Sequence, residues 1–287
     1  MSEALAALIE AERLPGGYAA VVEEYWRPLA GAIAGKPRAA GRPLVVGVNG
    51  AQGSGKSTLC RFLEPLLAEH GLRAVTLSLD DLYLTRAERQ EIAGDHHSLF
   101  ATRGVPGTHD VELGMALLDH LLAGKPADLP QFDKAADDRS REMLRIEGPV
   151  DVVLFEGWCV GAAPQSADAL RDPVNDLERL EDPDGTWRRE VNRRLATDYA
   201  ELFARIDLLV MLKAPDFAAV RANRRLQEDK LGAGPAVMDD AKLDRFLAHY
   251  QRLTGHMFAE MPARADVLFD IGSDQRPMRV STRGQSY

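Results

Sequence analysis

Residues 50–58 read Gly50-Ala51-Gln52-Gly53-Ser54-Gly55-Lys56-Ser57-Thr58 and match the pattern G-x-x-x-x-G-K-[ST], which wraps backbone N–H groups around the phosphates of a nucleotide. Apolar residues 44–48 precede the pattern as a short buried strand, and the apolar residues of 59–67 follow it at helical spacing. A glycine-rich turn before an ordinary helix is the alternative interpretation. Both flanks, however, supply the strand–loop–helix context of the motif, so we predict a nucleotide-binding α/β fold.

Each part of this loop has a chemical task. Gly50, Gly53 and Gly55 allow a tight turn around a phosphate because glycine adopts positive φ without strain. The helix that begins near Lys56 points its free N–H groups at the phosphates, and the Lys56 ammonium adds a mobile charge. Ser57 is expected to hold Mg²⁺ through its hydroxyl. The residues expected to contact the nucleotide are Gly50, Gln52, Gly53, Ser54, Gly55, Lys56, Ser57 and Thr58.

The composition is that of an ordinary globular chain. Its 287 residues are 45% hydrophobic and 28% charged, which allows one large α/β domain or two small ones. The formal net charge of −9 argues against a nucleic-acid or membrane partner. Two cysteines, Cys60 and Cys159, lack the spacing of a metal site or a disulfide framework. Without a long apolar segment or a secretory signal at the first residues, we expect a cytoplasmic protein.

Four further strand candidates indicate a parallel sheet. They lie at 74–79, 150–155, 208–212 and 267–271, and each is short, apolar and separated from the next by long helical stretches. The fold class that we predict is α/β: a three-layer sandwich around a doubly wound parallel sheet.

Three regions are predicted along the chain. Residues 1–40 form a helical N-terminal segment packed on the core, 41–275 form the nucleotide-binding domain, and 276–287 form a polar tail that we expect to be poorly ordered. Within the domain, 81–149 is too long for a simple crossover and is expected to build a second binding site. A lid is expected at about 215–235.

Acidic residues follow two of the predicted strands. Asp80 and Asp81 end the stretch that begins at 74, and Glu156 follows the strand at 150–155. Ligands of open parallel sheets bind beyond the carboxyl ends of the strands, where a carboxylate can accept a proton from an attacking hydroxyl or hold Mg²⁺. We predict that Asp80 is the general base and that Glu156 lies beside the metal. A helix N-cap or a solvated turn is the alternative for each, and the favoured one for Asp81.

Positive charge gathers in the long connection between the second and third strands. A loop rich in Gly and Pro presents Arg103 and His109 rigidly, and the Arg103 fork suits a carboxylate or a phosphate. Lys134 and Arg139 supply more positive charge downstream. The alternatives are an unpartnered surface arginine and a solvated charged loop.

Another basic cluster follows the strand at 208–212. Asp216 begins a helix that carries Arg221 and Arg225, and basic residues there can fold over a nucleotide as a lid. An exposed arginine-rich helix face is the alternative. For the segment 182–194, which changes from acidic to basic, lid, interface and plain surface all stay open.

Several strings of the sequence, taken together, resemble one enzyme group. These strings are 50–58, 79–85 (LDDLYLT), 103–110 (RGVPGTHD), 132–134 with 138–139, 155–158 (FEGW) and 225–228 (RLQE). Their order and spacing are similar to those of the P-loop small-molecule kinases related to phosphoribulokinase, uridine kinase and pantothenate kinase, and more closely to the D-glycerate 3-kinase family of plants, fungi and bacterial relatives. The resemblance implies a general base at Asp80 and an acid near Mg²⁺ at Glu156.

The leading hypothesis is therefore an ATP-dependent kinase that phosphorylates a hydroxyl of a small polar acid, with D-glycerate as the favoured acceptor. Lys56 and Mg²⁺ would hold the phosphates, Asp80 would deprotonate the hydroxyl, and lid arginines would stabilise the transition state. The residues expected to contact the acceptor are Asp81, Tyr83, Arg103, His109, Lys134 and Arg139. The lid arginines expected to act in catalysis are Arg221 and Arg225.

Two alternatives stay open at this point. One is a kinase of the same fold for a nucleoside, pantothenate or another sugar acid. A nucleoside would favour aromatic stacking, and few aromatic residues lie in the acceptor segment. The other is a regulatory NTPase without a small-molecule acceptor, against which stand the acids that follow two strands.

Overall fold

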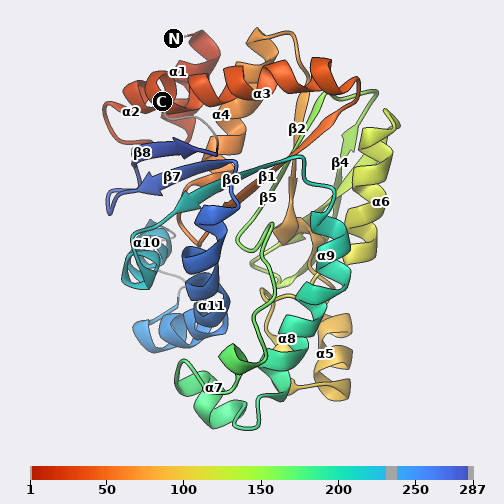
Figure 1. The fold of residues 1–287 in the computed structure, drawn as a ribbon, viewed down its shortest axis with the longest axis vertical. Coiled ribbons are helices and arrows are strands. Elements are labelled where there is room, and N and C mark those ends of the chain that lie inside the picture. The colour runs from red at the N-terminus through yellow and green to blue at the C-terminus, as the bar shows by residue number, and fades with distance from the viewer. Residues whose placement is uncertain (1, 231–237, 284–287) are drawn as a thin grey trace.

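A mostly parallel sheet forms the centre of the computed structural model, which describes residues 2–230 and 238–283 (Figure 1). Within these residues the strand order of the main sheet is β2-β5-β1-β6-β7-β8, and β8 alone runs antiparallel to its neighbour. The strands are β1 (Leu44–Gly50), β2 (Ala74–Ser78), β5 (Val152–Gly157), β6 (Leu208–Lys213), β7 (Val267–Ile271) and β8 (Pro277–Thr282). The predicted doubly wound α/β sheet is confirmed.

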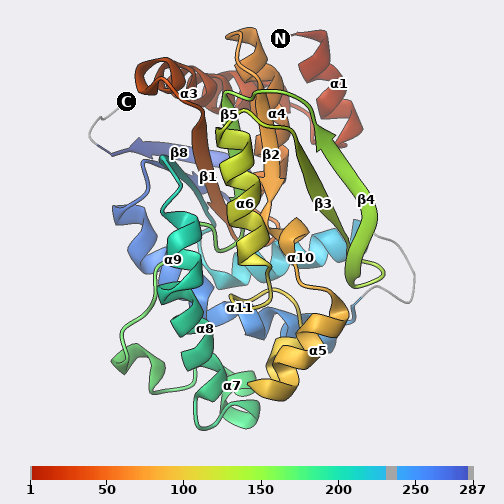
Figure 2. The same cartoon turned by 90° about the vertical axis from the view of Figure 1, so that its right-hand side faces the viewer.

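Helices cover both faces of the sheet because successive residues of its strands are apolar. In β1, Val46 and Val48 pack into one hydrophobic cluster, whereas Val45 packs into the cluster on the opposite face. The first cluster is covered by α1 (Glu3–Ala11), α2 (Tyr18–Val21), a π-helical turn (Val22–Trp26), α3 (Arg27–Ala40) and α4 (Lys56–Glu69). The opposite cluster is covered by α6 (Val111–Leu122), α9 (Asp198–Phe203) and α11 (Asp240–Glu260). Figure 2 shows α6 in front of the sheet.

The remaining helices lie around the carboxyl ends of the strands. They are α5 (Arg86–Asp95), α7 (Asp176–Glu181), α8 (Thr186–Ala196) and α10 (Phe217–Lys230). Short 3-10 turns occur at Leu79–Leu82, Ser98–Ala101, Asp168–Leu170 and Met261–Ala263. Figure 1 shows α5, α7 and α8 together at the end of the molecule opposite the N-terminal helices, and Phe100, Leu177 and Trp187 belong to the small apolar cluster that joins them.

A β-hairpin stands apart from the main sheet (Figure 2). It consists of β3 (Ala127–Asp133) and β4 (Asp138–Ile146), which pair antiparallel with a register shift between Pro130 and Phe132. The sequence predicted an insertion here but not a hairpin. The strand β4 was not predicted from the sequence. Its middle residues are exposed, so it shows no alternation of apolar and polar residues.

The expectation of a poorly ordered tail is wrong for residues 277–282. These residues form β8, which pairs with β7, and Arg279 Nε donates to Asp270 Oδ2 at 2.8 Å. An edge strand is partly exposed to solvent, so its polar composition is compatible with ordered structure. Residues 284–287 of the expected tail and 231–235 of the expected lid lie outside the described residues.

Candidate active site

The loop after β1 has the conformation that a phosphate site requires. Gly53 and Gly55 have φ angles of 74° and 88°, a region in which other residues are strained. A Cβ at Gly53 would lie 2.8 Å from the Cβ of Asn223, so the loop packs directly against α10. Gly55 precedes the first turn of α4 without a capping side chain, and the space beside its Cα is open. The free N–H groups of this turn therefore face room for an anion.

Glu156 connects the phosphate loop to β2. Because β5 extends to Gly157, Glu156 lies within the strand, directly opposite Ser78 of β2. Its Oε1 accepts hydrogen bonds from Ser57 Oγ at 2.9 Å and from Ser78 Oγ at 3.1 Å. Lys56 Nζ lies 3.9 Å from Oε2. Ser78 is not among the site residues predicted from the sequence, although its position at the end of a strand is the kind of position at which ligands bind.

This corner fits the Mg²⁺ that the motif implies. Glu156 Oε2 is buried, and no described residue donates a hydrogen bond to it. An unsatisfied carboxylate oxygen beside the Ser57 hydroxyl offers the hard oxygen ligands that Mg²⁺ prefers. In residues 2–230 and 238–283 no group of three His, Cys, Asp or Glu side chains forms a closed metal cage.

Asp80 is held between a cation and a phenol. The 3-10 turn after β2 presents its carboxylate, which accepts from Lys134 Nζ at 2.7 Å and from the Tyr83 hydroxyl at 3.0 Å. Burial alone would raise the pKa of the Asp80 carboxyl, but the charges of Lys134 and Lys56 outweigh burial and hold this pKa well below its usual range. In return, the charge of Asp80 raises the pKa of Lys134. The two side chains therefore form an ion pair at neutral pH.

One cavity of about 410 Å³ joins these groups. Its polar wall comprises Ser57, Ser78, Asp80, Asp81, Lys134 and Glu156, with Gln131, Thr76, Arg61 and Glu64, and its apolar wall is Leu77, Leu129, Pro130 and Leu144. The hairpin β3–β4 thus forms the side of the cavity that faces the phosphate loop. Asp81 also fastens this hairpin, because its Oδ1 accepts from the Phe132 amide at 3.0 Å.

Arg103 and Arg139 do not lie on the wall of this cavity. Arg103 forms an ion pair with Asp137 and lies with its guanidinium 5.4 Å from the centre of the Phe132 ring. Arg139 donates to the Tyr83 carbonyl at 3.2 Å and to Asp110 at 3.3 Å. Both guanidinium groups therefore hold the surrounding loops together in this structure.

His109 is buried next to Tyr83, and the two rings stack with their centres 4.5 Å apart. Burial lowers the pKa of His109 to about 3, so this side chain is neutral at physiological pH. His109 therefore does not supply a positive charge for an anionic acceptor.

Arg221 and Arg225 lie on α10, where their side chains are partly exposed. Arg221 donates to Asp244 Oδ2 at 3.1 Å, and Arg225 donates to Asp240 at 2.9 Å. Arg225 also pairs with Asp229 of α10 at 3.2 Å. Among the hydrogen bonds and ion pairs of the described residues, none joins these two arginines to the phosphate loop. In this structure the two arginines therefore lie on an exposed helix face, which is the alternative to the predicted lid.

Two buried side chains that the sequence did not single out as site residues fix the loops around the cavity. Arg89, which is 1% exposed, donates to the carbonyls of Ala101 at 3.0 Å and Asp137 at 2.7 Å. Trp158 donates from Nε1 to the Gly104 carbonyl at 2.8 Å. The string Glu-Gly-Trp had marked the place of Trp158, whereas no sequence signal separates Arg89 from a surface arginine.

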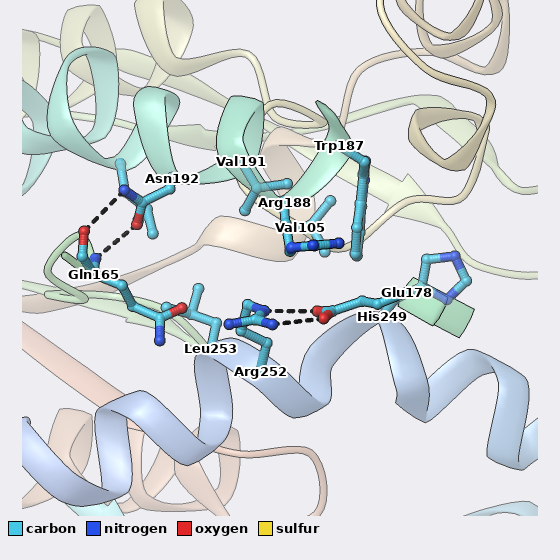
Figure 3. A pocket seen from close by; sticks show the side chains of 11 residues that line it. Val105, Gln165, Glu178, Trp187, Arg188, Val191, Asn192, His249, Arg252 and Leu253 are labelled. Carbon is cyan, nitrogen blue, oxygen red and sulfur yellow. Dashed lines mark hydrogen bonds and ion pairs between the residues drawn. The ribbon is translucent and has the colours of Figure 1, made fainter. Parts of the chain in front are cut away.

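The segment 182–194, whose role the sequence left open, is buried in part and lines a second pocket (Figure 3). Arg188 is 3% exposed and donates to Asp182 Oδ2 at 2.9 Å, while Asp182 is fully buried. On the opposite wall, Glu178 and Arg252 form a two-bond ion pair. The buried ion pair of Asp182 and Arg188 holds this segment in place, so the segment is not simply exposed surface.

Comparisons with known proteins agree with this geometry. No protein-family model matches the chain. The uncharacterized kinase mug58 of Schizosaccharomyces pombe is 35% identical over 229 residues, which cover 75% of this chain and 81% of that protein. The chloroplastic D-glycerate 3-kinase of Arabidopsis thaliana is 30% identical over 261 residues, or 82% of this chain and 54% of the plant protein. The chain belongs to the P-loop small-molecule kinases.

A solved structure extends the comparison to three dimensions. The D-glycerate 3-kinase of Cryptococcus neoformans superposes with a TM-score of 0.78 at 28% identity, covering 93% of this kinase and 100% of that chain. The similarity therefore extends over most of the fold. None of the described helices of this kinase is long and apolar enough to cross a membrane.

Proposed function

We propose that this kinase transfers the terminal phosphoryl group of ATP to a hydroxyl of D-glycerate, with 3-phosphoglycerate as the product. The observation that carries the proposal is the ion pair of Asp80 and Lys134 on the wall of the 410 Å³ cavity. A carboxylate suits a hydroxyl that must lose its proton, and an ammonium suits a carboxylate. A small hydroxy acid carries both groups.

In this proposal, one end of the cavity binds the nucleotide phosphates and the other end binds the acceptor. The loop at 50–58 and the Lys56 ammonium bind the phosphates, and Ser57 and Glu156 would hold Mg²⁺. When bound, Mg²⁺ neutralises charge on the phosphate oxygens. Asp80 orients the acceptor hydroxyl and takes its proton. Lys134 moves from Asp80 to the acceptor carboxylate, which leaves Asp80 a stronger base at the moment of transfer.

The lining of the cavity favours a hydroxy acid over a nucleoside. No aromatic side chain lies among the described residues of the wall, while stacking on an aromatic ring is the usual way to hold a base. Tyr83 and Phe132 are close by, but they are 3% and 8% exposed and pack against each other. The similarity to the D-glycerate 3-kinases of Arabidopsis thaliana and Cryptococcus neoformans also supports D-glycerate as the acceptor.

The proposal is tested by the release of ADP from Mg·ATP by the purified protein, alone and with D-glycerate, D,L-lactate, uridine or pantothenate, with product mass measured in each case. We expect stimulation by D-glycerate, together with a phosphoglycerate product. Stimulation by uridine or pantothenate instead would assign another acceptor. Slow hydrolysis that no acceptor stimulates would remove the proposal and favour a regulatory NTPase.

A further inference from the structure

Tyr199 of α9 contacts the loop that carries His109, although 90 residues separate the two along the chain. Its side chain is completely buried. The phenol oxygen accepts the Gly107 amide hydrogen at 3.0 Å. The same oxygen lies 2.6 Å from Nδ1 of the His109 ring.

Counting hydrogens around this oxygen decides the tautomer of His109. A phenol offers two lone pairs and one hydrogen, and a peptide N–H can only donate. The Gly107 amide takes one lone pair of Tyr199, and the buried hydroxyl hydrogen then needs an acceptor, which His109 Nδ1 supplies. In the opposite arrangement, with Nδ1–H donating to the phenol, both the hydroxyl hydrogen and the Nε2 lone pair would be buried without a partner, which is less favourable. A neutral imidazole that accepts at Nδ1 carries its own hydrogen at Nε2.

The His109 ring also remains neutral. It is 4% exposed, and burial lowers its pKa to about 3, while the nearby charge of Asp80 acts in the opposite direction without offsetting burial. At neutral pH the ring is therefore an uncharged donor at Nε2.

This donor has no acceptor in the described part of the chain. Nε2 of His109 is buried and without a hydrogen-bond partner. The ring stacks on Tyr83, whose hydroxyl donates to Asp80, so the unused N–H lies one ring away from the proposed base. A buried donor without an acceptor is unfavourable, and an oxygen of a bound ligand would satisfy it.

We propose that Tyr199 is a positioning residue that fixes His109 as the neutral Nε2–H tautomer, and that this N–H donates a hydrogen bond to an oxygen of the acceptor substrate. The inference rests on the proposed function, because it takes the surroundings of His109 as part of the acceptor site. A neutral donor recognises a hydroxyl or carboxylate oxygen without adding a second cation beside Lys134.

The tautomer is measurable in the free protein by NMR of the imidazole nitrogens, with the His109 signals assigned by their loss in His109→Gln. We expect an unprotonated Nδ1 and a protonated Nε2, both unchanged between pH 5 and 9. In Tyr199→Phe the signals should move toward a mixture of tautomers. A protonated Nδ1 in the wild type, or titration within this range, would overturn the inference.

Contact with the acceptor is tested by kinetics with D-glycerate at saturating Mg·ATP. His109→Phe keeps a ring without a donor and should raise the KM for D-glycerate roughly 10- to 100-fold, the effect of losing one buried hydrogen bond, with KM for ATP within about twofold. His109→Gln places an amide N–H near the position of Nε2 and should restore most of the affinity. Tyr199→Phe should raise this KM by about three- to tenfold. An unchanged KM in His109→Phe contradicts the proposal.

Tyr18→Phe serves as the matched control. Tyr18 is 8% exposed and accepts from Trp26 Nε1 at 3.3 Å on the other face of the sheet. Removing that hydroxyl should lower thermal stability without changing the KM for D-glycerate. Equal changes of KM in Tyr18→Phe and Tyr199→Phe would show a general loss of stability and overturn the positioning role. If the wild type does not phosphorylate D-glycerate, the proposed function fails, and the NMR result decides the tautomer independently.

Discussion

Asp80 is the residue on which the proposed chemistry depends most directly. Its carboxylate receives hydrogen bonds from Lys134 and Tyr83 and lies on the wall of the cavity. The two donors orient the carboxylate before any substrate binds, and preorganisation of this kind lowers the barrier to proton transfer. The charges of Lys134 and Lys56 hold the pKa of Asp80 low, so under the proposed mechanism the acceptor must draw Lys134 away for the carboxylate to act as a base.

Asp80→Asn should lower kcat by roughly two to four orders of magnitude, the range for losing a general base. The amide keeps the size of the side chain but cannot take a proton. The KM for ATP should change little, because the phosphate loop is untouched. Measurement of both constants at saturating acceptor checks this, and a kcat equal to that of the wild type would remove Asp80 from the mechanism.

Lys134→Met should change the pH dependence of the reaction. In the wild type the pKa of Asp80 lies below its usual range, so Asp80 stays ionised and kcat/KM should show no acid limb from it above pH 5. Without the ammonium, mainly Lys56 opposes the effect of burial, so the pKa of Asp80 rises and activity should be lost as the pH falls through the new value.

The control for this prediction is Lys134→Arg, which keeps the charge and should keep the flat profile. Profiles of kcat/KM between pH 5 and 9 for the two variants give the answer. Identical acid limbs would show that Lys134 does not set the pKa of Asp80.

At the scale of elements, α7 is fixed to α11 by a largely buried ion pair. Glu178 is fully buried, and Arg252 donates to both of its carboxylate oxygens at 2.7 Å (Figure 3). Glu181, on the same helix, forms an exposed ion pair with Arg245. The two pairs have the same charges and differ in burial, so they form a natural comparison.

Glu178→Ala should destabilise the protein by about 3–5 kcal/mol, because it leaves the largely buried Arg252 charge without a counter-ion, with only the Ala169 and Asp172 carbonyls accepting from it. Glu181→Ala should cost about 1 kcal/mol or less, since the partners are solvated. Urea unfolding of the two variants and the wild type measures the difference. Similar losses in both variants would mean that the Glu178 pair is solvated after all.

The whole molecule should gain stability when the phosphate loop is filled. At about 100 times its Kd, a ligand that binds only the folded state adds about 2.7 kcal/mol. For a chain of this size, that corresponds to a rise of roughly 4–5 °C in Tm. Mg·ATP should produce this shift in calorimetry, and AMP, which lacks the phosphates that the loop binds, should not.

The matched variant is Lys56→Ala, which should lose most of the shift because it removes the only charged side chain of the 50–58 loop. An equal shift for Mg·ATP in this variant would place the nucleotide elsewhere.

The sequence predicted the parts of this fold that leave a local pattern. The apolar strands and the glycine loop follow from short stretches, and the neighbouring acids Asp80 and Glu156 follow from their positions at strand ends. The strand β4 could not be predicted, because its exposed residues show no periodicity. Nor could the contact of His109 with Tyr199, since nothing local marks a pair that only tertiary packing brings together. The roles assigned to the site residues and the division at 1–40, 41–275 and 276–287 stay predictions.

The separate hairpin of β3 and β4 has a consequence for how such an enzyme can diverge. The nucleotide end of the cavity belongs to the central sheet, whereas much of the acceptor wall belongs to a two-stranded unit with its own hydrogen-bond ladder. Substitutions at Leu129 or Leu144 alter that wall without breaking any strand pairing of the central sheet. Under the proposed function, natural variation, or a designer, can therefore change the choice of acceptor by exchanging one short unit that keeps Lys134, while the phosphate loop is inherited unchanged.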